Sequence, residues 1–213
     1  MSDELIDHLC ADLRPVRRSA IARRLAAGVG VGGLVSALLM LFVLGPRPDM
    51  GHASATEIFW IKGAYTLALA CIGIWAAERL ARPAAEARQR LAWFVAPLAA
   101  VTLLALAQLA AAPPQIRGPM VFGSSANECP WFIMLLSIPP FAGLVWAMRG
   151  LAPTRLGLAG AVCGLAAGGA GSFVLTFHCT ESTAPFLAIW YTLGVLAAGL
   201  AGLLLGPRVL RWR

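Results

Sequence analysis

The sequence predicts an all-α integral membrane protein: a bundle of six transmembrane helices with both termini in the cytoplasm. Its 213 residues are 59% apolar and 13% charged, whereas a soluble domain carries about 25% charged residues. A chain of this size and apolarity cannot cover itself with polar surface in water, which excludes most classes of soluble enzyme. The apolar residues also gather in six long stretches, and the arginines concentrate in alternate connections between them.

Each of the six stretches approaches or reaches the roughly 20 residues that a helix needs to cross a hydrocarbon core. The stretches are residues 25–45, 58–77, 91–112, 131–148, 156–177 and 184–206. The fourth is the shortest and contains Pro139 and Pro140 at its middle. Such a pair would end a helix in water, but in a bundle the neighbouring helices can satisfy the freed carbonyl groups. We therefore expect one kinked helix there.

The arginines predict the orientation of the bundle. Fourteen of them lie before the first stretch, in the second and fourth connections and in the C-terminal tail, whereas only Arg47 and Arg117 lie in the other connections. An excess of Lys and Arg marks the cytoplasmic side, so both termini are expected there. Lys62 is the one Lys or Arg inside a stretch, about one turn from its outer end, and we expect its ammonium group to reach the membrane interface.

Residues 1–18 are predicted to form a cytoplasmic segment ahead of a transmembrane domain of residues 19–213. Leu5, Leu9 and Leu13 recur every four residues, which is typical of an apolar stripe on a short helix that Pro15 then ends. The remaining face is acidic, whereas helices that lie on lipid are usually rich in Lys and Arg. The pattern favours a groove on a basic protein partner. The expected partner-binding residues are Leu5, Ile6, Asp7, Leu9, Asp12, Leu13 and Arg14.

Two cysteines are predicted to lie on the non-cytoplasmic side. Cys129 precedes the fourth stretch and Cys179 follows the fifth, so the alternating topology places both at similar depth. Thiols in that compartment can form a disulfide. With His178, Glu128 and Glu181 nearby, they could instead bind a soft metal ion transiently. Both alternatives stay open at this point, and no resident cofactor is expected.

Residues for catalysis or transport are sparse inside the stretches. A transporter would be expected to carry an acidic intramembrane residue or paired broken helices. A haem or a Ser-His-Asp site would need histidine within the membrane, but His8, His52 and His178 lie outside the spans or at their edges. We therefore expect no enzymatic activity. The alternative classes are a small transporter or channel and a thiol-redox membrane protein, and against the latter the chain has no C-x-x-C motif.

Several motifs together resemble one known family. They are Ala11-Asp12-Leu13-Arg14-Pro15-Val16-Arg17-Arg18, Phe59-Trp60-Ile61-Lys62, Cys129-Pro130-Trp131-Phe132 with Pro139-Pro140, and His178-Cys179 followed by Ser182, Pro185-Phe186-Leu187, Trp190 and Gly194. In order and spacing they look like the negative regulator of sigma-F family, which comprises six-helix inner-membrane anti-sigma factors of bacteria. Where that family often has a second aromatic residue or a histidine after the tryptophan, this chain has Tyr191.

The resemblance implies a function and a location. Residues 1–18 would hold an extracytoplasmic-function sigma factor at the bacterial inner membrane. Cys129 and Cys179 would serve as the stress-responsive switch that releases it. The implied partners are that sigma factor and the lipid bilayer, with no direct contact to nucleic acid.

Overall fold

The computed structural model describes residues 19–82, 87–151 and 153–211, and within these ranges the chain is helical, without strands. Six helical stretches are long and apolar enough to cross a membrane: Ala20–Leu44, Glu57–Leu80, Arg88–Ala111, Cys129–Arg149, Leu156–Leu175 and Ala184–Val209. All six overlap the predicted stretches, with ends that differ by at most five residues. The prediction of an all-α chain with six candidate spans is confirmed.

Three of the stretches are single helices and three are composite. The single helices are α4 (Glu57–Leu80), α8 (Cys129–Arg149) and α9 (Leu156–Leu175). The composite stretches are α2 (Ala20–Leu39) with the π-helical turn η1 (Met40–Leu44), α5 (Arg88–Ala92) with α6 (Val95–Ala111), and α10 (Ala184–Phe186) with the π-helical turn η2 (Leu187–Tyr191) and α11 (Thr192–Val209). The break before α6 follows from Pro97, which has no N–H to donate to the Trp93 carbonyl.

Two short helices lie in the connections, where the sequence does not predict them. They are α3 (Met50–Ala53), between the first and second spans, and α7 (Pro114–Phe122), between the third and fourth. Helix α7 begins with Pro114 at its first position, where a missing N–H costs nothing. Its end is anchored to the last span, since the Trp190 indole N–H donates to the carbonyl of Val121 at 2.8 Å.

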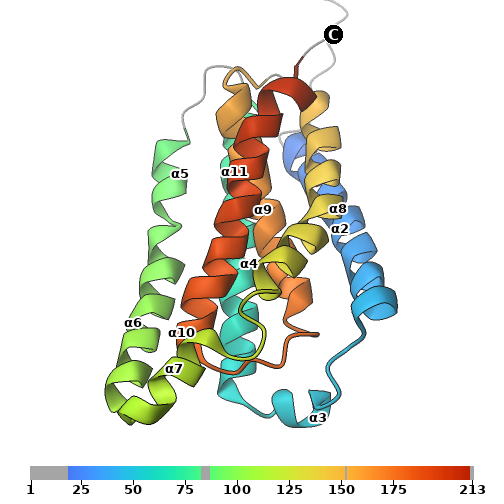
Figure 1. Cartoon of the computed structure of the whole chain (residues 1–213). Helices are drawn as coiled ribbons and strands as arrows, with labels where there is room; N and C mark the ends of the chain where they lie inside the picture. The colour runs from blue at the N-terminus through green and yellow to red at the C-terminus, as the bar shows by residue number, and fades with distance from the viewer. Residues whose placement is uncertain (1–18, 83–86, 152, 212–213) are drawn as a thin grey trace, which may run out of the picture.

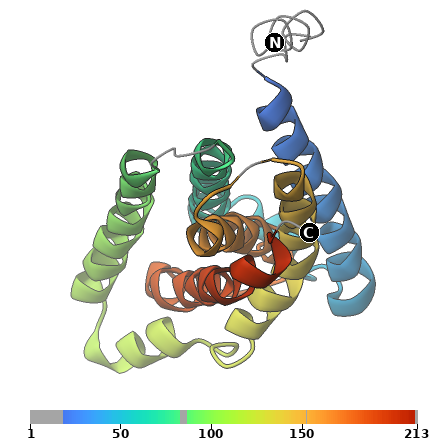
Figure 2. The ribbon, with the colours of Figure 1, turned by 90° about the horizontal axis from the view of Figure 1, so that it is seen from above.

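Helix α9 forms the centre of the bundle. It is rich in glycine and alanine, and it packs against α4, α8 and α11. Figure 2, which looks along the bundle, shows α2 and the α5–α6 segment at opposite edges. Helix α2 packs chiefly on α8, and α6 packs on α10 and α4. The central helix therefore has neighbours on several sides, whereas α2 has one principal neighbour.

The pairing of α9 with α11 brings two backbones into direct contact. Gly160 and Gly164 lie one helical turn apart, and a Cβ atom on either would overlap the carbonyl of Gly202 or Ala198 respectively. Small residues at this spacing let helices approach closely in lipid, where the hydrophobic effect does not drive helices together. We call this contact the α9–α11 seam. This close packing joins two helices of one chain.

A second close contact joins α2 to the middle of α8. The α2–α8 seam consists of Gly28, Gly32 and Ser36 on α2 and of Leu136, Pro140 and Gly143 on α8. Pro140 has no N–H, so the carbonyl of Leu136 lacks its usual helical partner. The hydroxyl of Ser36 donates to that carbonyl at 2.6 Å. Helix α8 therefore continues through the proline pair, as expected, because a neighbouring helix supplies the missing donor.

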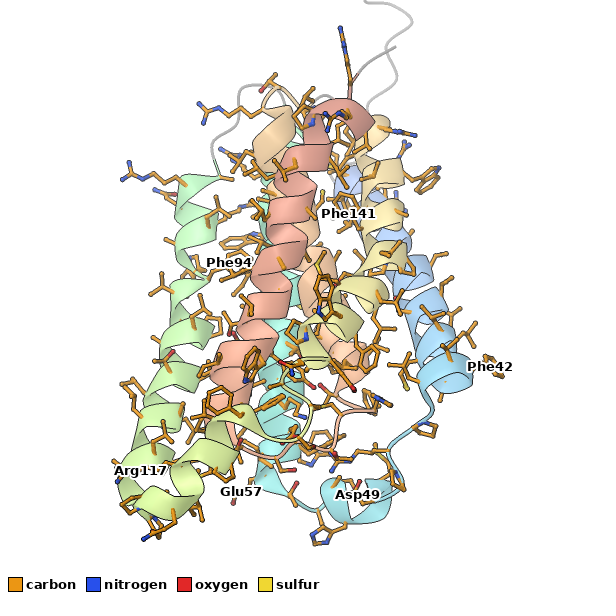
Figure 3. All side chains as sticks on the ribbon, viewed as in Figure 1. Phe42, Asp49, Glu57, Phe94, Arg117 and Phe141 are labelled. Carbon is orange, nitrogen blue, oxygen red and sulfur yellow. The ribbon has the colours of Figure 1, made fainter. Side chains whose placement is uncertain are left out.

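The two ends of the bundle differ in charge. At the terminal end, α2 begins and α11 ends (Figure 1), and the arginines there are Arg23, Arg24, Arg79, Arg82, Arg88, Arg90, Arg149, Arg155, Arg208 and Arg211. At the thiol end, α8 begins with Cys129 and Cys179 follows α9. Figure 3 shows Arg117 at this second end, with Asp49 and Glu57. The arginines thus separate between the two ends as the alternating connections predict.

Candidate functional site

Cys129 and Cys179 meet at the thiol end of the bundle. Cys129 is the first residue of α8, and Cys179 lies in a turn just beyond α9, where its N–H donates to the carbonyl of Leu175 at 2.9 Å. Both residues are buried, with 2% and 7% of their surface exposed, and they are free thiols that belong to one core cluster and line one pocket. The structure thus brings together the two cysteines that the sequence places on one side.

Lys62 lies against this thiol pair. The expectation that its ammonium group reaches the membrane interface is wrong: the residue is 2% exposed, on the face of α4 that also buries Phe59 and Thr66. Its Nζ donates to the carbonyl of Cys179 at 3.2 Å and lies 5.1 Å from the centre of the Tyr191 ring. A carbonyl and an aromatic face replace the water that the ammonium group would otherwise bind.

Arg47 contacts the Cys179 turn from the other side. Its backbone N–H donates to the carbonyl of Phe177 at 3.0 Å, and its Nη1 donates to the carbonyl of Cys179 at 3.2 Å. The guanidinium group also binds both carboxylate oxygens of Asp49 at 2.7 Å. Hydrogen bonding within this pair raises the pKa of Arg47 and lowers the pKa of Asp49. Arg47 therefore stays charged while it ties the end of η1 to the thiol site.

Glu181 joins the two connections that carry the cysteines. Its carboxylate accepts hydrogen bonds from the backbone N–H and the hydroxyl of Ser124, both at 2.7 Å, and from the hydroxyl of Ser125 at 3.2 Å. Gly123 has a φ of +53°, and a Cβ atom there would overlap the carboxylate. The glycine is thus required both by the backbone conformation and by the close approach of Glu181.

The five residues considered for metal binding do not converge into one ligand set. Glu181 is engaged by the serines, and Nδ1 of His178 is hydrogen-bonded to the carbonyl of Gly45 at 2.7 Å. Glu128 is exposed beside the thiol pair. Over the described ranges, no three His, Cys, Asp or Glu side chains are placed to hold a metal ion together. The geometry therefore presents a thiol pair with cationic neighbours.

Tyr191 completes the site from the last span. It closes the π-helical turn η2 and is fully buried. Its hydroxyl has no hydrogen-bond partner of standard geometry among the described residues, but it lies beside the Cys179 sulfur. Single π-helical turns inside α-helices occur frequently at functional sites. Here the turn places the buried Tyr191 hydroxyl, which has no such partner among the described residues, beside the thiol pair.

The surroundings of Cys179 favour its thiolate form. The hydrogen bond from the Cys129 thiol and the positive charge of Lys62 lower the pKa of Cys179, against burial, which raises it. The thiolate is the form of cysteine that acts as a nucleophile and binds soft metals. The site can therefore support thiol chemistry near neutral pH.

A pocket of about 300 Å³ gives access to the two thiols. Its lining includes both cysteines and Arg47, and it reaches the surface at the exposed residues Pro48 and Glu128. The volume falls at the lower end of the range for small-molecule sites in proteins. A small reagent can thus reach sulfur atoms that are themselves almost covered.

The predicted partner-binding residues Leu5, Ile6, Asp7, Leu9, Asp12, Leu13 and Arg14 lie outside the described residues. The described chain begins at Ser19, directly before α2. The α2 helix is therefore the direct covalent link between that segment and the bundle.

Known proteins identify the family. A family model described as negative regulator of sigma F matches residues 9–212. The chain belongs to this family. It is 41% identical to the anti-sigma-F factor NrsF of Caulobacter vibrioides and 37% identical to the probable anti-sigma-F factor NrsF of Azospira oryzae, with 99% of each chain covered in both cases. No solved structure matches.

Membership in the negative regulator of sigma F family confirms the resemblance seen in the sequence, and it places the chain in a regulatory rather than a catalytic family. Sequence reasoning nevertheless missed Arg47, Lys62 and Tyr191 as parts of the site. One signal was available: a charge inside an apolar span usually faces the protein interior and marks function. Lys62 fits that rule, whereas nothing in the sequence pairs Arg47 with the Cys179 turn.

Proposed function

We propose that this chain is an anti-sigma factor of the bacterial inner membrane. Residues 1–18 bind an extracytoplasmic-function sigma factor in the cytoplasm and keep it from RNA polymerase. A stress agent that reacts with Cys129 and Cys179 on the opposite side of the membrane releases the sigma factor. The observation that carries the proposal is the match to the family over almost the whole chain, together with relatives named as anti-sigma-F factors.

The contacts of α2 support a route between the two sides. At the thiol end, Arg47 binds the carbonyl of Cys179, and the carbonyl of Gly45 binds His178. At the terminal end, α2 starts directly after the partner-binding segment. A change in the bonding of either thiol moves the turn after α9, and the hydrogen bonds of Arg47 and Gly45 to that turn pass the movement to α2. No direct contact between the sensor and the sigma factor is required.

The charge distribution supports the proposed orientation. The terminal end carries ten of the described arginines, whereas Arg47 and Arg117 lie at the thiol end. Basic residues in short loops stay on the cytoplasmic side during insertion. In this orientation the partner-binding segment lies in the cytoplasm, with the sigma factor. The thiols lie on the non-cytoplasmic side, where disulfides can form.

The experiment that tests the proposal is co-purification from membranes. Full-length protein with an affinity tag should retain a sigma factor, and deletion of residues 2–18 should abolish this. Leu9→Asp should do the same. A micromolar complex has a binding free energy of about 8 kcal/mol, and the cost of burying a charged aspartate in an apolar groove offsets it. Recovery of the full-length protein without a sigma factor would contradict the proposed function.

The release step has its own variants. Treatment with a thiol oxidant such as diamide, or with a thiol-reactive metal, should release the sigma factor from the wild-type protein. The double variant Cys129→Ser, Cys179→Ser should bind the partner and fail to release it. Cys163→Ser is the matched control, since Cys163 is fully buried in α9, remote from the pair. Normal release from the double variant would reduce the thiol pair to a structural role.

A further inference from the structure

A narrow groove of about 180 Å³ lies between α8 and α11, away from the thiol site. Its walls come from residues 134–141 of α8 and residues 198–205 of α11, and its floor comes from Gly164 and Ala167 of α9. Both walls also pack on α9 and on each other. The groove exists because glycine and alanine side chains on α9 and α11 are too short to fill the space beside α8.

The lining of the groove is apolar and reaches the surface of the bundle. Ile138 on one wall and Leu205 on the other are 61% and 42% exposed. Ser137 carries the one side-chain hydroxyl in the lining, and it donates to the carbonyl of Ile133 in its own helix at 2.5 Å. No donor or acceptor of the walls is therefore left for a polar occupant. The groove opens at the depth of the hydrocarbon core and favours an apolar occupant.

The dimensions of the groove restrict its occupant to a single chain of carbon atoms. Each wall covers seven residue steps, which is about 10 Å at the rise of an α-helix. A space of about 180 Å³ with this length is about 4 Å across on average. A helix with its side chains is about 10–12 Å in diameter, so neither a partner helix nor a helix of a second copy can enter. One acyl chain of a lipid can.

An arginine bridges the two walls at the terminal end of the groove. Arg149 is the last residue of α8, about two turns beyond Phe141. Its Nε donates at 2.7 Å to the carbonyl of Val209, the last residue of α11, one turn beyond Leu205. The guanidinium group of Arg149 therefore lies where a lipid in the groove would have its headgroup.

This end of the groove carries positive charge that no described carboxylate balances. Arg208 lies in the last turn of α11 and is exposed, as is Arg149. The described part of the terminal end holds one carboxylate, Glu78, which pairs with two arginines near α4. Nε of Arg149 is used by the protein, whereas its two Nη groups donate to no described residue. Guanidinium N–H groups of this kind bind phosphate oxygens strongly.

We propose that the groove binds one anionic phospholipid, with an acyl chain between α8 and α11 and its phosphate group at Arg149 and Arg208. The site goes beyond the proposed function and does not depend on it. It differs from the general lipid surroundings of a membrane protein in two ways that can be measured: one molecule is bound, and the charge of its headgroup determines the affinity.

The test is lipid binding to full-length protein, freed of lipid in a neutral detergent and followed by native mass spectrometry. The probes are dioleoyl phosphatidylglycerol, which is anionic, and dioleoyl phosphatidylcholine, which has the same chains and no net charge. Attraction of an anionic headgroup is worth about fivefold in affinity for each arginine near it. We expect one phosphatidylglycerol to bind at least about fivefold more tightly than phosphatidylcholine. Equal affinities overturn the proposal.

Arg149→Gln tests the headgroup contact. It should weaken binding of phosphatidylglycerol about fivefold and leave binding of phosphatidylcholine unchanged. Arg79→Gln is the matched control, because Arg79 is an exposed arginine at the same end on α4, which does not line the groove. Equal losses in the two variants would assign the preference to the total charge of this end and overturn the site.

Ala201→Leu tests the acyl-chain contact, because the larger side chain fills part of the groove. It should weaken the binding of both lipids, whereas Leu204→Phe, at an exposed position outside the lining, should weaken neither. Unchanged binding to a folded Ala201→Leu protein overturns the proposal. Should that variant not fold, competition on the wild-type protein decides. Soluble glycerol phosphate lacks the chain and should not displace phosphatidylglycerol, and its displacement at equal concentration would remove the groove from the site.

No sigma factor takes part in these measurements. The lipid site can therefore fail in a protein that retains and releases a sigma factor, and it can hold in a protein that binds none.

Discussion

The two glycine seams use the same residue spacing but differ in their surroundings. In the α9–α11 seam, intact helices meet at the centre of the bundle, and α9 is also packed against α4 and α8. In the α2–α8 seam, a helix at the edge lies on the proline pair of α8, and the Ser36 hydroxyl donates to the carbonyl that the proline leaves free. Small residues at intervals of four predict a close approach in both places. The neighbours decide which pair can shift.

This difference assigns separate roles to the two seams. A displacement of α9 would disturb three interfaces, because it is enclosed on several sides. A displacement of α2 changes chiefly its contact with α8, and α2 joins the thiol site to the predicted partner-binding segment through the covalent chain. We therefore expect the α9–α11 seam to stabilise the fold and the α2–α8 seam to shift when the thiols react.

The largest effect is expected from Gly164→Ala in the α9–α11 seam. The added methyl group overlaps the backbone of Ala198 and Gly199, and overpacking of this kind costs about 1–3 kcal/mol or more. The variant should lose thermal stability in detergent and membrane yield. Gly157→Ala on the same helix is the control, since its Cβ would meet only Leu203 and Pro207 at ordinary distances. Equal thermal stability of the two variants would contradict a stabilising role of the α9–α11 seam.

A different outcome is expected from Gly32→Ala in the α2–α8 seam. Its methyl group overlaps Pro139 and Pro140, but α2 lies at the edge and can move aside. We expect a folded protein with altered sigma-factor retention in the co-purification assay. The adjacent Gly33→Ala has open space around its Cβ and should behave as wild type. Unfolding of Gly32→Ala, with a stability loss as large as that of Gly164→Ala, would remove the distinction between the seams.

Arg47→Gln tests the hydrogen bond that connects the Cys179 turn to the end of η1, and so to the α2–α8 seam. It removes the charged donor to the Cys179 carbonyl and releases Asp49, a loss of about 1–3 kcal/mol for a buried charge-assisted hydrogen bond. The sigma factor should stay bound, and its release by diamide should be blunted. Arg117→Gln is the matched control at the same end, since Arg117 is exposed and, among the described residues, its side chain donates one hydrogen bond, to the nearby Ala112 carbonyl. Undiminished release from Arg47→Gln would exclude this contact from the route.

The smallest effect is expected from Ser36→Ala. The variant leaves the Leu136 carbonyl without a donor, which costs about 1 kcal/mol. The thermal midpoint should fall slightly, and the amount of oxidant needed for half-maximal release should change because the seam is looser. Ser54→Ala serves as the comparison, since its hydroxyl makes one exposed contact to Gly51. Identical oxidant responses in the two variants would show that the bridge is only structural.

Most of the fold could be predicted from the sequence, because a span is a local property. Length, apolarity and the position of arginines are read along the chain, and they predict six spans and the two ends. Helix α7 escaped prediction because its nine residues are stabilised by contacts elsewhere, such as the Trp190 indole. The π-helical turns also depend on packing that the sequence does not display.

The site could be predicted in part. Loop topology predicts that Cys129 and Cys179 share one side, and the family pattern points to both. The direction in which Lys62 points depends on how α4 is rotated in the bundle, and periodicity is weak in a helix that is apolar all round. The pairing of Arg47 with the Cys179 turn joins residues 132 positions apart. Such a contact follows from the tertiary structure and from no local pattern.

The central claim, that thiol oxidation shifts α2 against α8 while α9 and α11 stay together, can be measured directly. Spin labels attached to azide-bearing residues leave the cysteines free. Pulsed electron–electron double resonance then reports the distance between the two labels of a pair. Exposed positions at the terminal end provide two matched pairs, Ala26 with Arg149 and Arg155 with Arg208. Oxidation with diamide should change the first distance and leave the second unaltered. Release of the sigma factor with both distances unaltered, or equal changes in both, would contradict the account.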